Sequence, residues 1–190
     1  TCTGEVTNNA YIGGYIGRLS NVSVGGEMDV KNSSKVSFDG TANKVYLAGG
    51  IGAIEASQPI TIEGVVNTEN AVVTFNDNMS KKVLPTNIYL GGAVGFADLG
   101  ATEETRNTSI LNACENHGSV SYYGKCTDGA YIGGVVGHAK NASLNSCHNT
   151  GAIVSKGIAG GIDEFATGAA VNTRDMVVGG VVGEANYDIK

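Results

Sequence analysis

The sequence contains no tryptophan, only two prolines and few charged residues, which make up 16% of its 190 positions. No apolar run approaches the roughly 20 residues that a membrane-spanning helix needs. A net charge of −6 without any basic run argues against a protein that binds nucleic acid or an anionic membrane. A collagen would need glycine at every third position, and a disordered tail would carry more charge. We therefore expect one folded domain over residues 1–190, with no nucleic-acid partner and no membrane insertion.

Glycine, by contrast, is abundant, and much of it recurs in a seven-residue pattern that we call the glycine motif. Its clearest copy, residues 131–137, reads YIGGVVG, and the other copies are YIGGYIG, YLAGGIG, YLGGAVG and VVGGVVG. The copies lie 35 to 46 positions apart, and self-similarity at such a spacing indicates a repeat architecture. The motifs begin at Tyr11, Tyr46, Tyr89, Tyr131 and Val177.

The glycine motif favours a strand over a helix, because each interior helical glycine costs about 1 kcal/mol relative to alanine. In an extended chain Ile132, Gly134 and Val136 share one face. Stacked copies would line up their aliphatic side chains, and the middle glycine would let an opposite wall approach closely. These predicted ladder glycines are Gly14, Gly49, Gly92, Gly134 and Gly180.

A second pattern, which we call the asparagine motif, reads Cys-x-Asn-x-Gly-x-Val/Ile at residues 114–120 and 147–153. A looser copy starts at Asn32, and the copy at Asn67 is one residue out of step in the alignment. Asparagine and glycine tolerate the backbone of a sharp corner, and equivalent asparagines can hydrogen-bond along a ladder.

Together the two motifs predict an all-β fold, a parallel β-solenoid of about four to five repeats with three short strands per coil. Variation in repeat length falls between the motifs, so we expect loop insertions at residues 76–86, 98–106 and 158–175. Within the last insertion, residues 158–162 imitate the glycine motif, but we expect a loop there.

The pairing of Gly-Gly-Val-Val-Gly with Cys-x-Asn-x-Gly resembles the GLUG-type repeats of bacterial surface and secreted proteins. The resemblance covers nearly the whole chain and is best over residues 89–157, with departures at Gly50 and Asn67. It implies spacers, stalks and adhesive scaffolds rather than catalytic units.

Four cysteines allow three pairings, between which the sequence does not choose. Cys114 and Cys147 occupy equivalent positions, and stacking in neighbouring repeats would bring their Cα atoms into disulfide range. Two buried thiols are the alternative. The other two disulfide candidates are Cys2, at the start of the chain, and Cys126, in a connecting segment.

Five Asn-x-Ser/Thr tripeptides are candidate glycosylation sites, although corners that favour asparagine and serine are the simpler explanation. They begin at Asn21, Asn32, Asn78, Asn107 and Asn141.

Evidence for catalysis or metal binding is thin, and we expect neither an enzyme nor a cofactor. The adjacent acidic pairs at residues 103–104 and 163–164 lie in insertions and would point to opposite faces of a strand. A zinc site built from Cys114, His117, Cys147 and His148 is conceivable, but stacked cysteines beside a polar turn account for the same residues.

The sequence starts in mid-repeat at Thr1 with no leader, and no capping element is visible at either end. We therefore expect a processed chain, a fragment or a subunit that stacks end to end. We expect an extracellular or cell-surface structural or adhesive protein, with self-association into a filament or stalk. The alternative is a surface module that binds glycans or proteins through the insertions. Its contact residues would be the aromatic side chains that we expect to be exposed, namely Tyr15, Phe96, Tyr122 and Tyr123.

Overall fold

The computed structural model describes residues 1–25, 30–76, 84–100, 102, 105, 108–156, 158–159 and 176–186. Within these residues the regular elements are all β-strands, and every strand pairs in parallel with its neighbours. The predicted all-β class with parallel pairing is therefore confirmed.

Three of the sheets have five strands each, and we name them A, B and C. Sheet A consists of β1 (Cys2–Glu5), β5 (Lys35–Thr41), β10 (Val72–Asn76), β15 (Ser119–Tyr123) and β21 (Ile153–Ser155). Sheet B consists of β2 (Ala10–Gly13), β6 (Lys44–Ala48), β11 (Asn87–Gly91), β17 (Gly129–Gly133) and β23 (Met176–Gly179). Sheet C consists of β3 (Ile16–Ser20), β7 (Ile51–Glu55), β12 (Val94–Asp98), β18 (Val136–Lys140) and β24 (Val182–Asn186).

Three smaller sheets, D, E and F, complete the described strands. Sheet D consists of β8 (Thr61–Glu63), β13 (Ile110–Asn112) and β19 (Ser143–Asn145). Sheet E consists of β4 (Val30–Asn32), β9 (Val65–Asn67), β14 (Glu115–Asn116) and β20 (His148–Asn149). Sheet F is the pair β16 (Lys125–Cys126) and β22 (Ile158–Ala159), so the start of the last predicted insertion is a paired strand rather than a loop.

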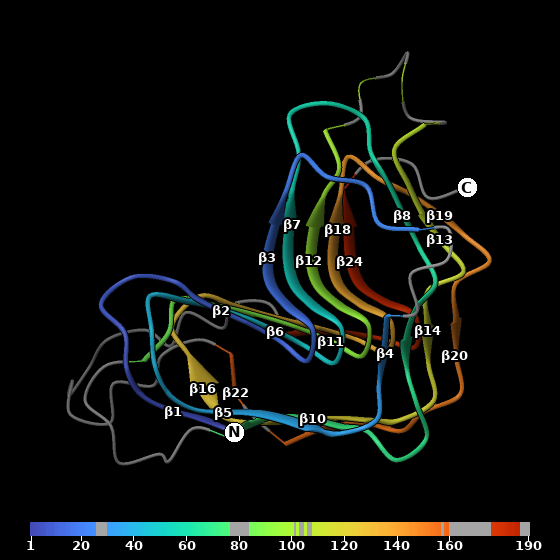
Figure 1. The fold of residues 1–190 in the computed structure, drawn as a ribbon. Coiled ribbons are helices and arrows are strands. Elements are labelled where there is room, and N and C mark those ends of the chain that lie inside the picture. Colours follow the sequence, from blue (N-terminus) through green and yellow to red (C-terminus); the bar gives the residue numbers. More distant parts are fainter. Residues whose placement is uncertain are drawn as a thin grey trace, which may run out of the picture.

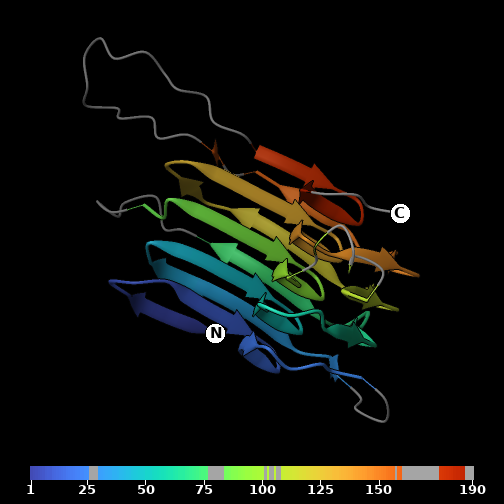
Figure 2. The same cartoon turned by 90° about the horizontal axis from the view of Figure 1, so that it is seen from above.

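Successive repeats add their strands to the sheets in turn, as the run from β10 to β14 does for sheets A to E. Figure 1 looks along the stack, so equivalent strands overlie one another. Sheets A and B form two layers in its lower part, sheet C rises from the end of sheet B, and sheets D and E descend opposite sheet C. Figure 2 shows the repeats following one another in chain order, from blue to red.

The prediction of three strands per repeat is wrong, since the runs β5 to β9 and β10 to β14 each contribute five strands and the run β15 to β20 contributes six. The glycine motif is not one strand: β11 ends at Gly91 and β12 starts at Val94, with a bend at Gly92 and Ala93 between them. The bend divides the motif between sheets B and C. A further corner, at Ala113, separates sheets D and E.

The second repeat, where the motifs depart from their pattern, keeps its register. Ala48 pairs with Gly91 despite the neighbouring Gly50, and Asn67 pairs with both Asn32 and Asn116. The expectation that Asn67 is out of step is therefore wrong, because the extra length follows it, in a turn where the Ala71 amide donates to the Thr68 carbonyl at 3.0 Å.

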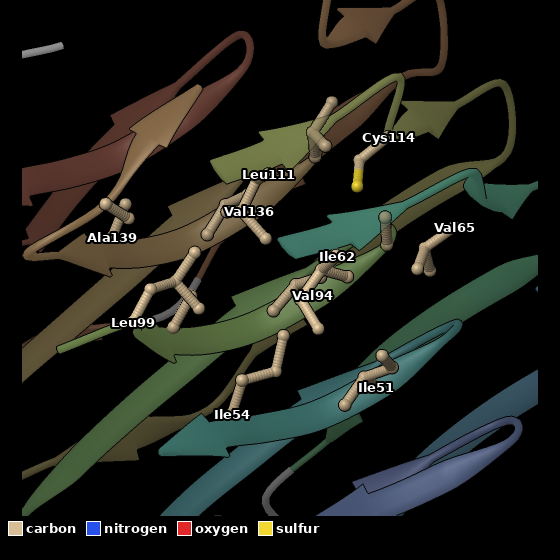
Figure 3. Close-up of a cluster of buried hydrophobic side chains, with 14 of the residues drawn as sticks. Ile51, Ile54, Ile62, Val65, Val94, Leu99, Leu111, Cys114, Val136 and Ala139 are labelled. Carbon is tan, nitrogen blue, oxygen red and sulfur yellow. The ribbon is translucent and has the colours of Figure 1, made fainter. Parts of the chain in front are cut away.

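Two apolar clusters fill the space between facing sheets. One lies between sheets A and B and contains Phe38, Phe75 and Tyr122. The other lies between sheet C and sheets D and E, and Figure 3 shows its side chains converging from both sides. Leu99, inside the predicted insertion 98–106, is fully buried in the second cluster. Members of this cluster labelled in the figure include Ile51, Ile54, Ile62, Val65, Val94, Leu99, Leu111 and Val136.

Candidate functional site

The asparagine motif places one asparagine of each repeat at the same position in sheet E. Each side-chain Nδ2 donates to the Oδ1 of the next asparagine, at 2.9, 2.7 and 2.7 Å in chain order. The two middle members are fully buried, so every side-chain amide there needs these partners. This row, the asparagine ladder, consists of Asn32, Asn67, Asn116 and Asn149.

In the first four glycine motifs the middle glycine lies against this ladder. A Cβ atom on Gly49 would lie 2.6 Å from Asn67 Cγ, and one on Gly134 would lie 2.6 Å from Asn149 Nδ2. Gly14 and Gly92 meet Asn32 and Asn116 in the same way. The last predicted ladder glycine, Gly180, differs, because a Cβ atom there would have no neighbour within 4 Å.

The last glycine of the motif has a separate role that the sequence analysis missed. A Cβ atom on Gly137 would lie 2.7 Å from the backbone nitrogen of Leu90, and one on Gly95 would lie 3.0 Å from that of Leu47. Sheet C therefore passes directly against the backbone of sheet B at this position. The signal was present, since this glycine is in all five copies of the motif.

The first residue of the glycine motif forms a column of stacked tyrosine rings. Successive ring centroids are 4.8, 4.9 and 5.3 Å apart, and the planes lie within 13° of parallel. Phe96 and His138 of sheet C pack against this column, so aromatic rings fill the angle between sheets B and C. The column consists of Tyr11, Tyr46, Tyr89 and Tyr131.

The environment of the column changes the acidity of its members. Burial, with a contribution from the neighbouring Tyr131, raises the pKa of Tyr89 to about 12. Burial also raises the pKa of Tyr46. At the first-repeat end, the Arg18 guanidinium lies 5.3 Å from the Tyr11 ring centroid and forms an ion pair with Glu55. The raised pKa values keep Tyr46 and Tyr89 neutral at ordinary pH, which suits a role in packing.

The four predicted contact aromatics do not gather on one surface. Tyr15 is 56% exposed at the bend between β2 and β3, and Tyr123 is 38% exposed at the end of β15. Phe96 is half-buried beside the tyrosine column. The expectation that Tyr122 is exposed is wrong, because it shares its face of β15 with buried Val120 and is itself fully buried.

No disulfide joins the four cysteines, which all lie among the described residues. Cys2 is exposed, whereas Cys126 is buried in the cluster between sheets A and B. Cys114 is buried and Cys147 is half-buried, at equivalent positions one repeat apart.

The candidate glycosylation sites divide into three kinds. Asn32 belongs to the buried asparagine ladder, so a glycan there would break its bond to Asn67. Asn21 and Asn141 lie at turns with φ near +50°, where Asn21 Oδ1 accepts from the Ser57 amide at 2.8 Å and Asn141 Nδ2 donates to Asp98 Oδ1 at 3.0 Å. The remaining two, Asn78 and Asn107, lie outside the described residues.

Within the described part of the chain, no group of three or more His, Cys, Asp or Glu side chains could hold a metal ion. His117 instead contacts Glu115 and Thr150, at 2.8 and 2.7 Å. The acidic pairs at residues 103–104 and 163–164, like most of the three insertions, lie outside the described ranges.

Comparisons of the chain with protein-family models, with curated proteins and with solved structures found no match. Among the residues that the structure describes, no helix is long and apolar enough to cross a membrane. A function is therefore inferred from the contacts within the chain.

Proposed function

We propose that this chain is a β-solenoid that serves as an extracellular or cell-surface structural element, a stalk or filament subunit of the kind that GLUG-type repeats suggest. One observation carries the proposal: chemically matched side chains stand in register from repeat to repeat. Tyrosine stacks on tyrosine and asparagine bonds to asparagine. Such ladders give a stiff body in which each repeat contacts its neighbours, which is what a spacer requires.

The two ends of the stack support assembly through a second copy of the chain. Along the inner row of sheet B, Leu47, Leu90 and Ile132 are fully buried. Val178 continues this row at the last repeat and is 46% exposed. Apolar side chains left partly in water at the end of a ladder gain burial when another repeat stacks on them.

The opposite end presents a matching surface. Ile12 opens the same row at the first repeat and is half-buried. It lines a hollow of about 440 Å³ together with Gly14, Asn32 and Val36. Asn32, which lines this hollow, is the first described member of the asparagine ladder. Its Oδ1 accepts a hydrogen bond from the Ser34 amide at 3.2 Å. We propose that Val178 of one copy packs over Ile12 of the next.

Electron microscopy of the concentrated native chain tests this proposal. We expect regular fibres, and we expect Val178→Lys to abolish them because a buried unpaired ammonium opposes stacking. Tyr123→Lys is the matched control, since Tyr123 is exposed on the side of an interior repeat, and its fibres should persist. Monodisperse particles at high concentration would contradict end-to-end assembly, as would fibres that survive Val178→Lys.

A further inference from the structure

The backbone brings Cys114 and Cys147 together across two neighbouring repeats. The His148 amide donates to the Cys114 carbonyl at 3.1 Å, and the Ala113 amide donates to the Asn145 carbonyl at 3.0 Å. Adjacent parallel strands hold equivalent Cα atoms about 4.8 Å apart, which lies within the range that a disulfide tolerates. The spacing of the two backbones therefore suits a bond between the pair.

The two thiols also interact with each other, in unequal surroundings. Cys114 is fully buried, and Figure 3 shows its sulfur directed into the core between the sheets. Cys147 is half-buried and packs against the edge of the same core. Its sulfur lies 3.4 Å from the Leu111 carbonyl and 3.6 Å from the Asn145 carbonyl.

This asymmetry separates the acidities of the pair. The hydrogen bond from Cys114 lowers the pKa of Cys147 to about 7. The same bond, together with burial, raises the pKa of Cys114. Since the thiolate is the reactive form of cysteine, the less buried cysteine is also the one that ionises first.

We propose that Cys114 and Cys147 form a reactive dithiol that small-molecule disulfides, such as oxidised glutathione, convert into a disulfide between adjacent repeats. The Cys147 thiolate attacks one glutathione sulfur, forming a mixed disulfide and releasing one glutathione thiolate. Cys114 then loses its proton and attacks the Cys147 sulfur, which releases the second glutathione. Two protein thiols are oxidised and one glutathione disulfide is reduced to two thiols.

The product would be a covalent staple between two repeats that otherwise meet only through hydrogen bonds and packing. It would close a loop of one whole repeat and restrict the unfolded chain. The interaction of each repeat with its neighbour would thereby become sensitive to the surrounding thiol–disulfide balance.

Intact-mass spectrometry of the folded chain tests the proposal, in a Cys2→Ser background that removes the exposed competing thiol. After treatment with oxidised glutathione, we expect the loss of two hydrogens and a Cys114–Cys147 cross-link in the peptide map. With Cys114→Ala added, we expect a single glutathione to remain on Cys147. With Cys147→Ala added instead, we expect no adduct on Cys114 in the folded chain, and the adduct to appear once the chain is denatured.

A thermal melt supplies a second readout. The oxidised Cys2→Ser chain should melt several degrees above its reduced form, and the difference should vanish with Cys147→Ala. The proposal is overturned if the folded chain gains two separate adducts in place of the cross-link, if Cys114 is modified before Cys147, or if neither reacts until the chain is denatured.

Discussion

At the scale of single residues, the corner between sheets D and E has a left-handed backbone in three successive repeats, although only one of them has glycine there. Gly64 has a φ of 69°, and the equivalent Ala113 and Ser146 have φ values of 47° and 51°. Side chains with a Cβ atom disfavour this conformation by about 1–2 kcal/mol. The corner is therefore set by the sheets on either side of it rather than by the residue in it.

We predict that Ala113→Gly stabilises the fold by about 0.5–1 kcal/mol. At a φ of 47° the substitution removes the backbone strain of alanine, and this gain exceeds the cost of the extra conformational entropy that glycine gives the unfolded chain. Gly64→Ala is the matched reverse change and should destabilise by about 1 kcal/mol. A Cβ atom on Gly64 would have no neighbour within 4 Å, so only the backbone preference changes. Urea denaturation of both variants measures the effect, and equal shifts in the same direction would contradict it.

We predict that His138 makes the fold sensitive to mild acid. Burial, with help from Lys140, lowers its pKa, although Asp98 opposes this and Glu184 Oε2 lies 3.6 Å from Nδ1. Between that lowered pKa and the ordinary value near 6.5, the unfolded chain binds more protons than the folded chain. Stability should therefore be lost as the pH falls below about 6.5.

The measurement for His138 is the thermal midpoint at several pH values for the wild type and for His138→Gln. We expect the variant to lose less stability than the wild type between neutral pH and pH near 5, because its side chain takes up no proton. An NMR titration that places the His138 pKa above 6.5 would reject the prediction.

At the scale of elements, the contact between the glycine bend and the asparagine ladder holds two walls of the repeat together. We predict that Gly134→Ala destabilises the fold by about 1–3 kcal/mol, because the new Cβ atom would collide with the Gly180 carbonyl oxygen of the next repeat and lie 2.6 Å from Asn149 Nδ2. Gly180→Ala is the control at the equivalent bend, where no atom lies within 4 Å, and it should change stability little.

Calorimetric melts of these two glycine variants give the comparison. A similar loss in both would mean that the backbone at the bend, rather than contact with the ladder, requires glycine. A loss in Gly134→Ala alone would assign the requirement to the contacts at this bend, with the ladder and with the backbone of the next repeat.

At the scale of the whole molecule, stability should vary along the stack, because each repeat is supported by its neighbours. We predict that the backbone amides of β6 and β11, which have paired strands on both sides, exchange with solvent more slowly than those of β2 and β23 at the ends of sheet B. Hydrogen–deuterium exchange with peptide resolution measures this gradient. Uniform exchange through all four strands would show instead that the stack opens only as a unit.

The sequence predicted the coarse fold and part of the candidate site. Periodicity identified the equivalent residues, and the register places Tyr46 beside Tyr89 as the motif alignment requires. The middle glycine was expected to admit an opposite wall, and Gly134 does lie against Asn149. The buried Tyr122 was mistaken for a contact residue, although its two-residue spacing from Val120 signalled the inner face.

The number of strands per repeat could not be predicted from the sequence. Seven residues such as YLGGAVG satisfy strand alternation whether the chain runs straight or bends at Gly92, since glycine allows both backbones. The bent form is favoured because the side chain of Asn116, 24 positions later in the sequence, packs against Gly92.

The sequence by itself thus determined which residues stack on which, because equivalent positions in a repeat find the same partners in neighbouring repeats. Only the tertiary structure decided where the chain turns, which rings fill the angle between sheets B and C, and that Cys114 is buried while Cys147 is half-buried. Those outcomes depend on contacts between different sheets within one repeat, which repeat spacing does not encode.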